Sequence, residues 1–208
     1  MNKKSIRFFN DHEVRAVWDE ENNKYVVLSG DDTIDGKSRN IAYSLFDNEV
    51  LDNMEPGTVK CLQQIHSYLF GGLYDFAGKI RTVTISKGGT IFCRAEYLKH
   101  NLETIEKMPE TTFEEIVDKY VEMNVAHPFM EGNGRSTRIW LDLIFKKRLK
   151  MCVDWSLIDK KKYLAAMRKS VTDASRIKVL LKQALTDRIA DREIFMKGID
   201  YSYYYEQE

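Results

Sequence analysis

Residues 127–138 decide how the rest of the chain is interpreted: His127-Pro128-Phe129-Met130-Glu131-Gly132-Asn133-Gly134-Arg135-Ser136-Thr137-Arg138. A helix is predicted to end near His127, because a proline disfavours the helical state of the residue before it, and a second helix is predicted to begin near Arg135. The two glycines let the connecting loop turn its N–H groups inward, and Asn133 between them tolerates a left-handed conformation. Successive N–H groups at a helix N-terminus form an anion-binding concavity, so the loop is predicted to bind phosphate.

The charged side chains of this stretch fit the same interpretation. Arg135 and Arg138 are three residues apart and lie on neighbouring positions of one helical face, so they supply two positive charges beside the loop. Glu131 offers a hard oxygen ligand for a Mg²⁺ ion that bridges phosphate oxygens. His127, with an ordinary pKa of about 6.5, is suited to proton abstraction near neutral pH. Together these residues indicate phosphoryl or nucleotidyl transfer.

The stretch is not a Walker loop, because it lacks the GxxxxGK[ST] spacing and no apolar strand precedes it. It resembles the signature of the Fic family, HxFx[D/E]GNGRxxR, at every specified position. The resemblance covers about residues 57–208 and includes Ile65-His66 and the run from Phe70 to Gly78. It implies a mainly α fold, a Fic-type helical bundle around the loop with a β-hairpin flap. It also implies an enzyme that transfers AMP from ATP to a Tyr, Ser or Thr hydroxyl of a target protein and releases pyrophosphate.

The resemblance assigns a role to each residue of the motif. His127 would be the general base, Glu131 would coordinate Mg²⁺ between the α- and β-phosphates, and Phe129 would anchor the loop in the core. The expected nucleotide-binding residues are Gly132, Asn133 and Gly134 as a phosphate cradle, Arg135 at the β-phosphate and Arg138 at the γ-phosphate. ATP as substrate and Mg²⁺ are the implied small molecules.

The C-terminal run Ser202-Tyr203-Tyr204-Tyr205-Glu206-Gln207 resembles the inhibitory motif [S/T]xxxE[G/N] of one class of this family. In that class the glutamate pairs with the second motif arginine, here Arg138, and keeps it from the γ-phosphate. Ser202 and Glu206 are four residues apart and would share a helical face, while Gln207 departs from the Gly or Asn of the pattern. Tyrosines exposed beside the site would also suit self-modification, at Tyr203 and Tyr204.

A β-hairpin is predicted where Ile80–Ser86 and Thr90–Arg94 flank Lys87-Gly88-Gly89, since glycines supply the positive φ of a tight turn. An open hairpin edge invites pairing with an extended segment of another chain. The resemblance makes it the flap that aligns a target segment by main-chain bonds. The expected target-docking residues are Ser86, Lys87, Gly88, Gly89 and Thr90.

The remaining pattern divides the chain into residues 1–52, an N-terminal β-hairpin extension with a linker, and residues 53–208, a Fic domain with a C-terminal inhibitory helix. The N-terminal segment is rich in β-branched and aromatic residues, and Gly30–Arg39 is predicted to be a loop because it is rich in Gly, Asp and Ser. Helical periodicity then prevails. The expected helices begin near Val59, near Leu98, at a capping box of Thr111 and Glu114, at Arg135, at Tyr163, across Ile177–Thr186, and towards Tyr205.

Composition narrows the class of protein. The 208 residues are 43% hydrophobic, and 32 basic residues balance 32 acidic ones, so the basic excess typical of nucleic-acid binders is missing. Three widely spaced cysteines without CxxC spacing argue against a disulfide framework or a cysteine zinc site. The sequence shows neither a secretory signal nor a membrane-spanning run, so we expect a cytoplasmic protein.

Two other functions stay open from the sequence. The same site could remove AMP or use another nucleotide, or the chain could be a catalytically silent binding module that recruits a partner through its N-terminal hairpin. The target protein is not named by the sequence; a topoisomerase-like protein is one candidate, and a homo-oligomer is allowed. We interpret His12, His66 and His100 as structural, since their spacing is not that of metal ligands.

Overall fold

The computed structural model describes residues 16–19, 21–28, 30, 32–48, 50–87 and 89–207. The N-terminal segment before the first strand and the flap residue Gly88 lie outside these ranges. The elements in chain order are β1 (Ala16–Asp19), β2 (Lys24–Val27), α1 (Ile34–Asp47), η1 (Val50–Asn53), α2 (Val59–Phe70), β3 (Ser86–Lys87), β4 (Thr90–Ile91), α3 (Ala95–Glu106), α4 (Phe113–Ala126), α5 (Asn133–Leu149), β5 (Cys152–Val153), η2 (Trp155–Leu157), α6 (Lys160–Ser170), α7 (Ser175–Gln183), β6 (Leu185–Thr186) and α8 (Arg192–Glu206). The mainly helical fold class is confirmed.

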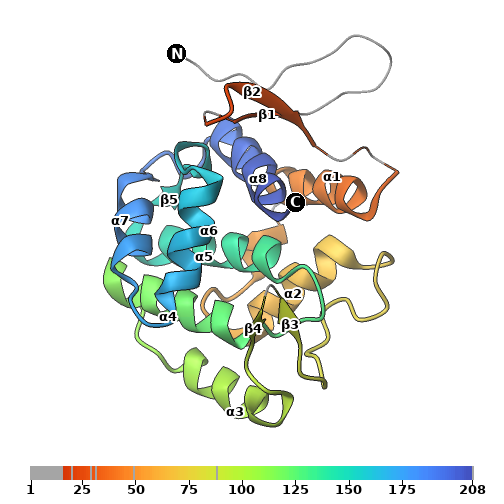
Figure 1. Ribbon diagram of the computed structural model, residues 1–208, viewed down its shortest axis with the longest axis vertical. Coiled ribbons are helices and arrows are strands. Elements are labelled where there is room, and N and C mark those ends of the chain that lie inside the picture. Colours follow the sequence, from red (N-terminus) through yellow and green to blue (C-terminus); the bar gives the residue numbers. More distant parts are fainter. Residues whose placement is uncertain are drawn as a thin grey trace.

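Helix α5 is the centre of the bundle. It packs against α4, α2 and α8 (Figure 1), and most of its side chains are buried, including those of Trp140, Ile144 and Phe145. A helix that is buried on nearly every side has no solvent face to fix its orientation, so its neighbours do so through side-chain packing. The N-terminus of α5, where the motif loop ends, is consequently held in place by three other helices.

Helix α4 positions the residue that precedes the loop. Its capping box is formed by Thr112 and Glu115, one residue later than predicted. The hydroxyl of Thr112 accepts the N–H of Glu115, and the Glu115 carboxylate accepts the N–H of Thr112. The helix ends at Ala126, as expected from Pro128, and His127 takes a left-handed conformation with φ 48°. That conformation turns the chain sharply out of α4.

The predicted loop at Gly30–Arg39 is wrong, since α1 begins inside it. The Thr33 hydroxyl accepts the N–H of Gly36 and caps the helix. Gly36 and Ser38, two of the residues that made the segment look irregular, are buried because α1 packs against α8. Small residues here allow close helix–helix approach, which composition alone did not reveal.

Two other predicted elements are shorter than expected. The hairpin was predicted from Ile80–Ser86 and Thr90–Arg94, but its strands pair Ser86 with Ile91 and Lys87 with Thr90, and the Phe92 N–H donates to the Ile85 carbonyl at 3.2 Å. The helix predicted across Ile177–Thr186 ends at Gln183, because Leu185–Thr186 forms β6 and pairs with β5.

The C-terminal helix α8 packs against α1 and α5, and the β1–β2 hairpin lies next to it (Figure 1). The hairpin is antiparallel with Ala16 opposite Val27, and Ala16 and Val17 are buried. Helix α8 is therefore covered by N-terminal segments, β1 and α1, and by the central elements α5, η2 and α6.

Within the described ranges, no helix is both long enough and apolar enough for a membrane crossing.

Candidate active site

The motif loop is closed by one side chain. The Asn133 amide donates to the Phe129 carbonyl at 2.8 Å and accepts the Phe129 N–H at 2.8 Å. Phe129 is fully buried, as predicted for a loop anchor. The left-handed residue is Gly132 (φ 80°) and not Asn133, which is already the first residue of α5. A Cβ at Gly132 would collide with the Phe70 ring, so only glycine fits there.

His66, a buried residue of α2, holds the loop through contacts that sequence reasoning did not predict. Its Nδ1 accepts the N–H of Gly78 at 2.9 Å, so its Nε2 carries the proton and donates to the Glu131 carbonyl at 2.8 Å. The ring stacks on Phe129 with centroids 3.8 Å apart. Burial lowers the pKa of His66 to about 4, so the imidazole is neutral at pH 7. The structural interpretation of this histidine is confirmed, and the structure it supports is the motif loop.

An acidic side chain sits at the N-terminus of α5. A Cβ at Gly134 would collide with Oε1 of Glu206 and would lie about 3 Å from the Arg138 guanidinium. The first N–H groups of a helix have no partner within the helix and attract anions. The absence of a side chain at Gly134 thus lets a carboxylate, or another anion of similar size, approach the start of α5.

Arg138 is surrounded by groups of α8 and has only 3% of its side chain exposed. Nη2 donates to Glu206 Oε1 at 2.7 Å and to the Ser202 carbonyl at 2.8 Å, and Nε donates to Ser202 Oγ at 2.8 Å. Nη1 donates to the Tyr163 hydroxyl at 3.3 Å. Burial would raise the pKa of Glu206, but the charge and hydrogen bond of Arg138 outweigh it and lower that pKa. The contact between Arg138 and Glu206 that was expected from the sequence is present in the structure.

Arg135 is equally buried, at 4% exposure, but it is held by other parts of the chain. It pairs with Asp35 at the start of α1 and with Glu131 at 3.0 Å. Its guanidinium lies over the rings of Phe70 (4.9 Å) and Tyr203 (5.4 Å). Sequence reasoning missed Asp35, because the segment that contains it was predicted to be a loop. No local signal places that carboxylate 100 residues away on the motif.

Glu131 lies at the edge of the site with 48% of its side chain exposed. One carboxylate oxygen accepts the Gly132 N–H and an Arg135 N–H, each at 3.0 Å. Among the described residues no cluster of three or more His, Cys, Asp or Glu side chains is arranged to hold a metal ion. Mg²⁺ in nucleotide sites is commonly bound by one or two carboxylates together with substrate phosphates, so a single accessible Glu131 fits that mode of binding.

His127 faces this arrangement from the end of α4. Because a carbonyl only accepts, the 3.3 Å contact between Nδ1 and the Asn124 carbonyl places the proton on Nδ1 and leaves Nε2 as the basic nitrogen. The ring stacks on Phe92, with centroids 3.7 Å apart and planes 8° from parallel. Burial lowers the pKa of His127 to about 4, opposed by the Asn124 carbonyl and by the charges of Glu206 and Glu131. The imidazole is therefore neutral and within electrostatic reach of both carboxylates.

The flap stands next to the same site. Lys87 Nζ lies 4.0 Å from Glu206 Oε2, and Phe92, which follows β4, covers His127. Ile91 has an exposed side chain at the tip. Of the predicted docking residues, Ser86 and Lys87 are exposed and Gly89 has the positive φ expected of a turn. The side chain of Thr90, like Gly88, lies outside what the structure describes.

The predicted exposure of the C-terminal tyrosines is wrong. Tyr203 and Tyr204 are buried, since α8 packs into the bundle instead of lying on its surface. The Tyr203 hydroxyl donates to Ser38 Oγ at 2.9 Å, and the Tyr205 hydroxyl donates to the carbonyls of Trp155 and Ile158. Self-modification at Tyr203 or Tyr204 consequently requires α8 to leave its place.

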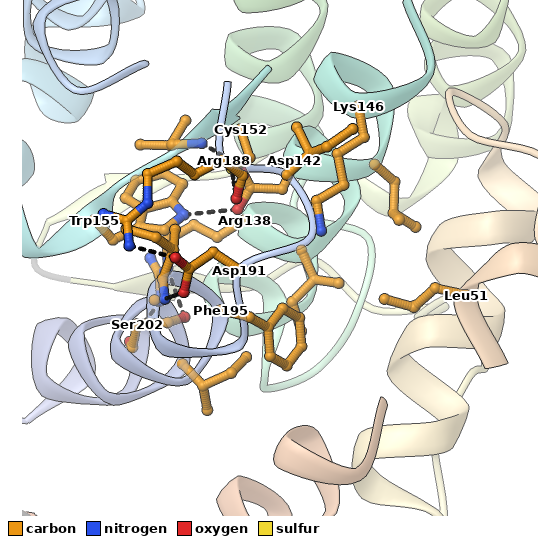
Figure 2. A pocket seen from close by; sticks show the side chains of 17 residues that line it. Leu51, Arg138, Asp142, Lys146, Cys152, Trp155, Arg188, Asp191, Phe195 and Ser202 are labelled. Carbon is orange, nitrogen blue, oxygen red and sulfur yellow. Dashed lines mark hydrogen bonds and ion pairs between the residues drawn. The ribbon is translucent and has the colours of Figure 1, made fainter. Parts of the chain in front are cut away.

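A cavity between α5, α8 and the segment that precedes α8 reaches Arg138 and Ser202 from the side of Trp155 and Phe195 (Figure 2). Asp142, in its wall, accepts the indole N–H of Trp155 and the N–H of Val153, each at 2.8 Å. Burial raises the pKa of Asp142 to about 6. These contacts fix Trp155, whose carbonyl in turn holds Tyr205 of α8.

The fold and the loop define a helical protein whose central helix begins at an anion-binding site with two buried arginines, a neutral histidine and an accessible carboxylate. Residues 56–145 match the model of the Fic/DOC family. That segment, which contains the whole of residues 127–138, is similar to the Fic/DOC family.

Several curated relatives are named as protein adenylyltransferases. A probable protein adenylyltransferase y4lH of Sinorhizobium fredii is 26% identical over 61% of this chain and 72% of its own length. The probable protein adenylyltransferase Fic of Escherichia coli is 32% identical over 39% of this chain and 46% of its own length. Protein adenylyltransferase VbhT of Bartonella schoenbuchensis is 26% identical over 64% of this chain and 30% of its own length. The chain thus spans less than half the length of the last two.

Solved structures share the fold at low sequence identity. BepC of Bartonella tribocorum, crystallised with AMPPNP, is 18% identical with a TM-score of 0.58 over 72% of this chain and 85% of that one. An N-terminal Fic domain from Bartonella quintana, with bound ADP, is 19% identical with a TM-score of 0.60 over 74% of this chain and 85% of that one. Fic-1 of C. elegans is 18% identical with a TM-score of 0.58 over 78% of this chain and 50% of that one.

Proposed function

We propose that this chain is a protein adenylyltransferase that moves AMP from ATP to a Tyr, Ser or Thr hydroxyl of another protein, and that α8 inhibits it. The observation that carries the proposal is the Glu206 carboxylate, which lies against Gly134 at the N-terminus of α5 and binds Arg138. An internal anion already uses the contacts that a phosphate group would need. The names of the curated relatives and the AMPPNP and ADP bound in two structural neighbours support a nucleotide as the natural ligand.

The triphosphate would replace Glu206 at the start of α5. The N–H groups of the first turn would donate hydrogen bonds to phosphate oxygens, while Arg138 and Arg135 neutralise the phosphate charge. Arg135 Nε is buried without a hydrogen-bond partner among the described residues, which leaves one donor to be satisfied. Positioning and charge stabilisation supply most of the catalysis in phosphoryl transfer, so fixed cations of this kind suit the reaction.

His127 would take the proton from the target hydroxyl as it attacks the α-phosphorus, and pyrophosphate would leave towards Arg138. The base is Nε2, because Nδ1 is committed to the Asn124 carbonyl. The lowered pKa keeps Nε2 unprotonated at neutral pH. General base catalysis typically contributes about 10²–10⁴-fold, so the residue is expected to be indispensable.

Glu131 is the residue that would hold Mg²⁺, together with phosphate oxygens of the nucleotide. The ion would neutralise charge on the phosphates of the leaving group. Binding of Mg²⁺ would draw Glu131 away from Arg135. Arg135 would then keep Asp35 as its partner.

Inhibition would follow from competition for Arg138. While Glu206 occupies that guanidinium, a γ-phosphate cannot bind it, and α8 is further held by Ser202, Tyr203 and Tyr205. A difference of about 1.4 kcal/mol changes an equilibrium tenfold, so the loss of one buried ion pair is enough for a large response.

The test uses α-labelled ATP with a bacterial lysate and three forms of the protein: wild type, Glu206→Gly, and Glu206→Gly with His127→Ala. We expect at least tenfold more labelled protein with Glu206→Gly than with wild type, and at least a hundredfold loss when His127 is also replaced. Mass spectrometry of the labelled band identifies the modified residue. Transfer of label from γ-labelled ATP, or no labelling by Glu206→Gly in the presence of Mg²⁺, would overturn the proposal.

A further inference from the structure

Arg81 lies between α2 and β3 and is almost completely buried, with 5% exposure. Its side chain donates to carbonyls from three separate segments: Nε to His127 (2.7 Å), Nη1 to Val83 (2.6 Å), and Nη2 to Cys93 (2.6 Å) and Ala126 (3.0 Å). Its backbone N–H also donates to the Pro128 carbonyl at 2.9 Å. Among the described residues no carboxylate lies within ion-pair distance of it, so carbonyl oxygens alone solvate this cation.

These carbonyls belong to the end of α4 and to the base of the flap, the two parts that the proposed reaction brings together. Ala126 and His127 form the end of α4, where the helix dipole favours a cation. Val83 precedes β3 and Cys93 follows β4, so the two residues lie on the two chain segments at the base of the flap. A planar guanidinium donates in fixed directions, so one side chain sets the distance between the flap and the end of α4.

The imidazole of His127 depends on this arrangement at three points. Its backbone is left-handed, which is unfavourable for a non-glycine residue, and Arg81 binds its carbonyl and that of the next residue. Its ring stacks on Phe92, whose neighbour Cys93 is bonded to Arg81. Cys93 also donates its N–H to the Val125 carbonyl of α4 at 3.1 Å. Backbone and ring are therefore both located through the same guanidinium.

We propose that Arg81 is a positioning residue that holds Nε2 of His127 in line with a target hydroxyl presented by the flap. The inference rests on the proposed adenylyl transfer and adds a residue outside the 127–138 motif. Arg81 touches neither nucleotide nor target. Its loss is expected to affect the transfer step and to leave the binding of ATP, which occurs at the start of α5, nearly unchanged.

The experiment compares Arg81→Lys and Arg81→Met, each in the Glu206→Gly form, by AMP incorporation from α-labelled ATP into lysate protein. We expect Arg81→Met to lower the maximal rate at least tenfold, with the ATP concentration for half-maximal rate changed less than twofold. Arg81→Lys keeps the charge but not the four directed bonds, so it recovers only part of the rate. The matched control is Arg176→Met, at an exposed arginine of α7, which leaves both parameters unchanged.

A second measurement does not depend on activity. The pKa of His127, followed by imidazole NMR, responds to Glu206, Glu131 and Arg81 as its charged neighbours. In the wild-type background Arg81→Met removes a cation and raises that pKa, whereas Arg81→Lys keeps it closer to the wild-type value. If the Glu206→Gly protein labels no lysate protein, the proposed function fails. The titration of His127 still tests whether Arg81 acts on that imidazole. A full rate with Arg81→Lys and Arg81→Met, or a rate loss matched by an equal loss of ATP affinity, overturns the inference.

Discussion

Arg135 and Arg138 stand almost one turn apart on α5, are buried to the same degree, and are each paired with a carboxylate. The carboxylates come from opposite ends of the chain, Asp35 from α1 and Glu206 from α8. Both lie outside residues 56–145, the part that matches the family model. The matched segment thus supplies the two cations, and the flanking helices α1 and α8 each supply a carboxylate that pairs with one of them.

The two pairs differ in what remains when α8 moves. Glu206 is the only carboxylate on Arg138 among the described residues, and Ser202, its other main partner, is on the same helix. Arg135 keeps Asp35 and Glu131, neither of which belongs to α8. We therefore regard Arg138 as the cation that becomes available and Arg135 as the cation that stays fixed. Four predictions test this difference.

The largest effect is expected from removing the available cation. Arg138→Met combined with Glu206→Gly should label protein about a hundredfold less than Glu206→Gly alone, because loss of one group that stabilises transition-state charge typically costs about 10²–10³-fold. Initial rates with α-labelled ATP measure this. Arg176→Met in the same background is the control for loss of an arginine. If the Arg138 variant labels as well as Glu206→Gly, Glu206 does not act by occupying Arg138.

The stability of the two pairs should differ in the same direction. Glu206→Gln leaves Arg138 buried without a carboxylate and is expected to cost about 3 kcal/mol. Asp35→Asn should cost about 1 kcal/mol, because Asp35 is 34% exposed and Arg135 retains Glu131. Urea unfolding of both variants beside wild type measures the two costs. Equal costs, or a larger cost for Asp35→Asn, would show that Arg135 is not the better supported cation.

The same comparison separates what sequence could predict from what it could not. Residues 127–138 were sufficient to predict the turn after α4 and the two arginines on one face of α5, because these features depend on local backbone preferences. The burial of Phe129 was expected only from the resemblance to the Fic family. Asp35 and Arg81 were not predictable, since each acts on a residue more than 40 positions away. The C-terminal tyrosines look like an exposed terminus until their hydroxyl partners, Ser38 and the carbonyls near Trp155, are known.

The predicted length of the flap strands was wrong for a related reason. The predicted hairpin began at Ile80, yet the carbonyl of Val83 accepts a hydrogen bond from the Arg81 side chain, and the N–H of Arg81 donates to the Pro128 carbonyl and not to a partner strand. Side-chain competition for backbone groups shortens the ladder. The start of α1 was missed because its glycine and serine are selected by packing on α8, which is a tertiary requirement that overrides composition.

The stability of the motif loop, which leads into the first turns of α5 and their two arginines, should depend on pH through His66. Its pKa is about 4 in the folded protein against about 6.5 when unfolded, so the unfolded chain binds more protons between these values and stability falls as pH is lowered from 6.5 towards 4. The contribution lost is about 2 kcal/mol by pH 5. His66→Gln removes this part, so its free energy of unfolding should decrease about 2 kcal/mol less than that of wild type between pH 7 and pH 5. His100→Gln, at an exposed histidine of α3, is the control, and an unchanged pH dependence in His66→Gln would show that the buried imidazole does not hold the loop as a neutral group.

The smallest effects concern how α8 is held. Tyr203→Phe removes the hydroxyl bond to Ser38 of α1 but keeps the ring over Arg135, and Tyr205→Phe removes the bonds to η2 and the residue after it. Loss of either hydroxyl should weaken the docking of α8 by about 1 kcal/mol, because the single Tyr205 proton is shared between two carbonyls. This corresponds to a roughly fivefold rise in labelling by an otherwise wild-type chain. If α8 leaves as one unit, the two variants raise labelling to a similar extent, because both bonds break in the same step. Neither should add to the labelling by Glu206→Gly, in which Arg138 is already free. A rise confined to Tyr203→Phe would instead mean that the α1 side alone controls release, and that Arg135 takes part in the switch after all.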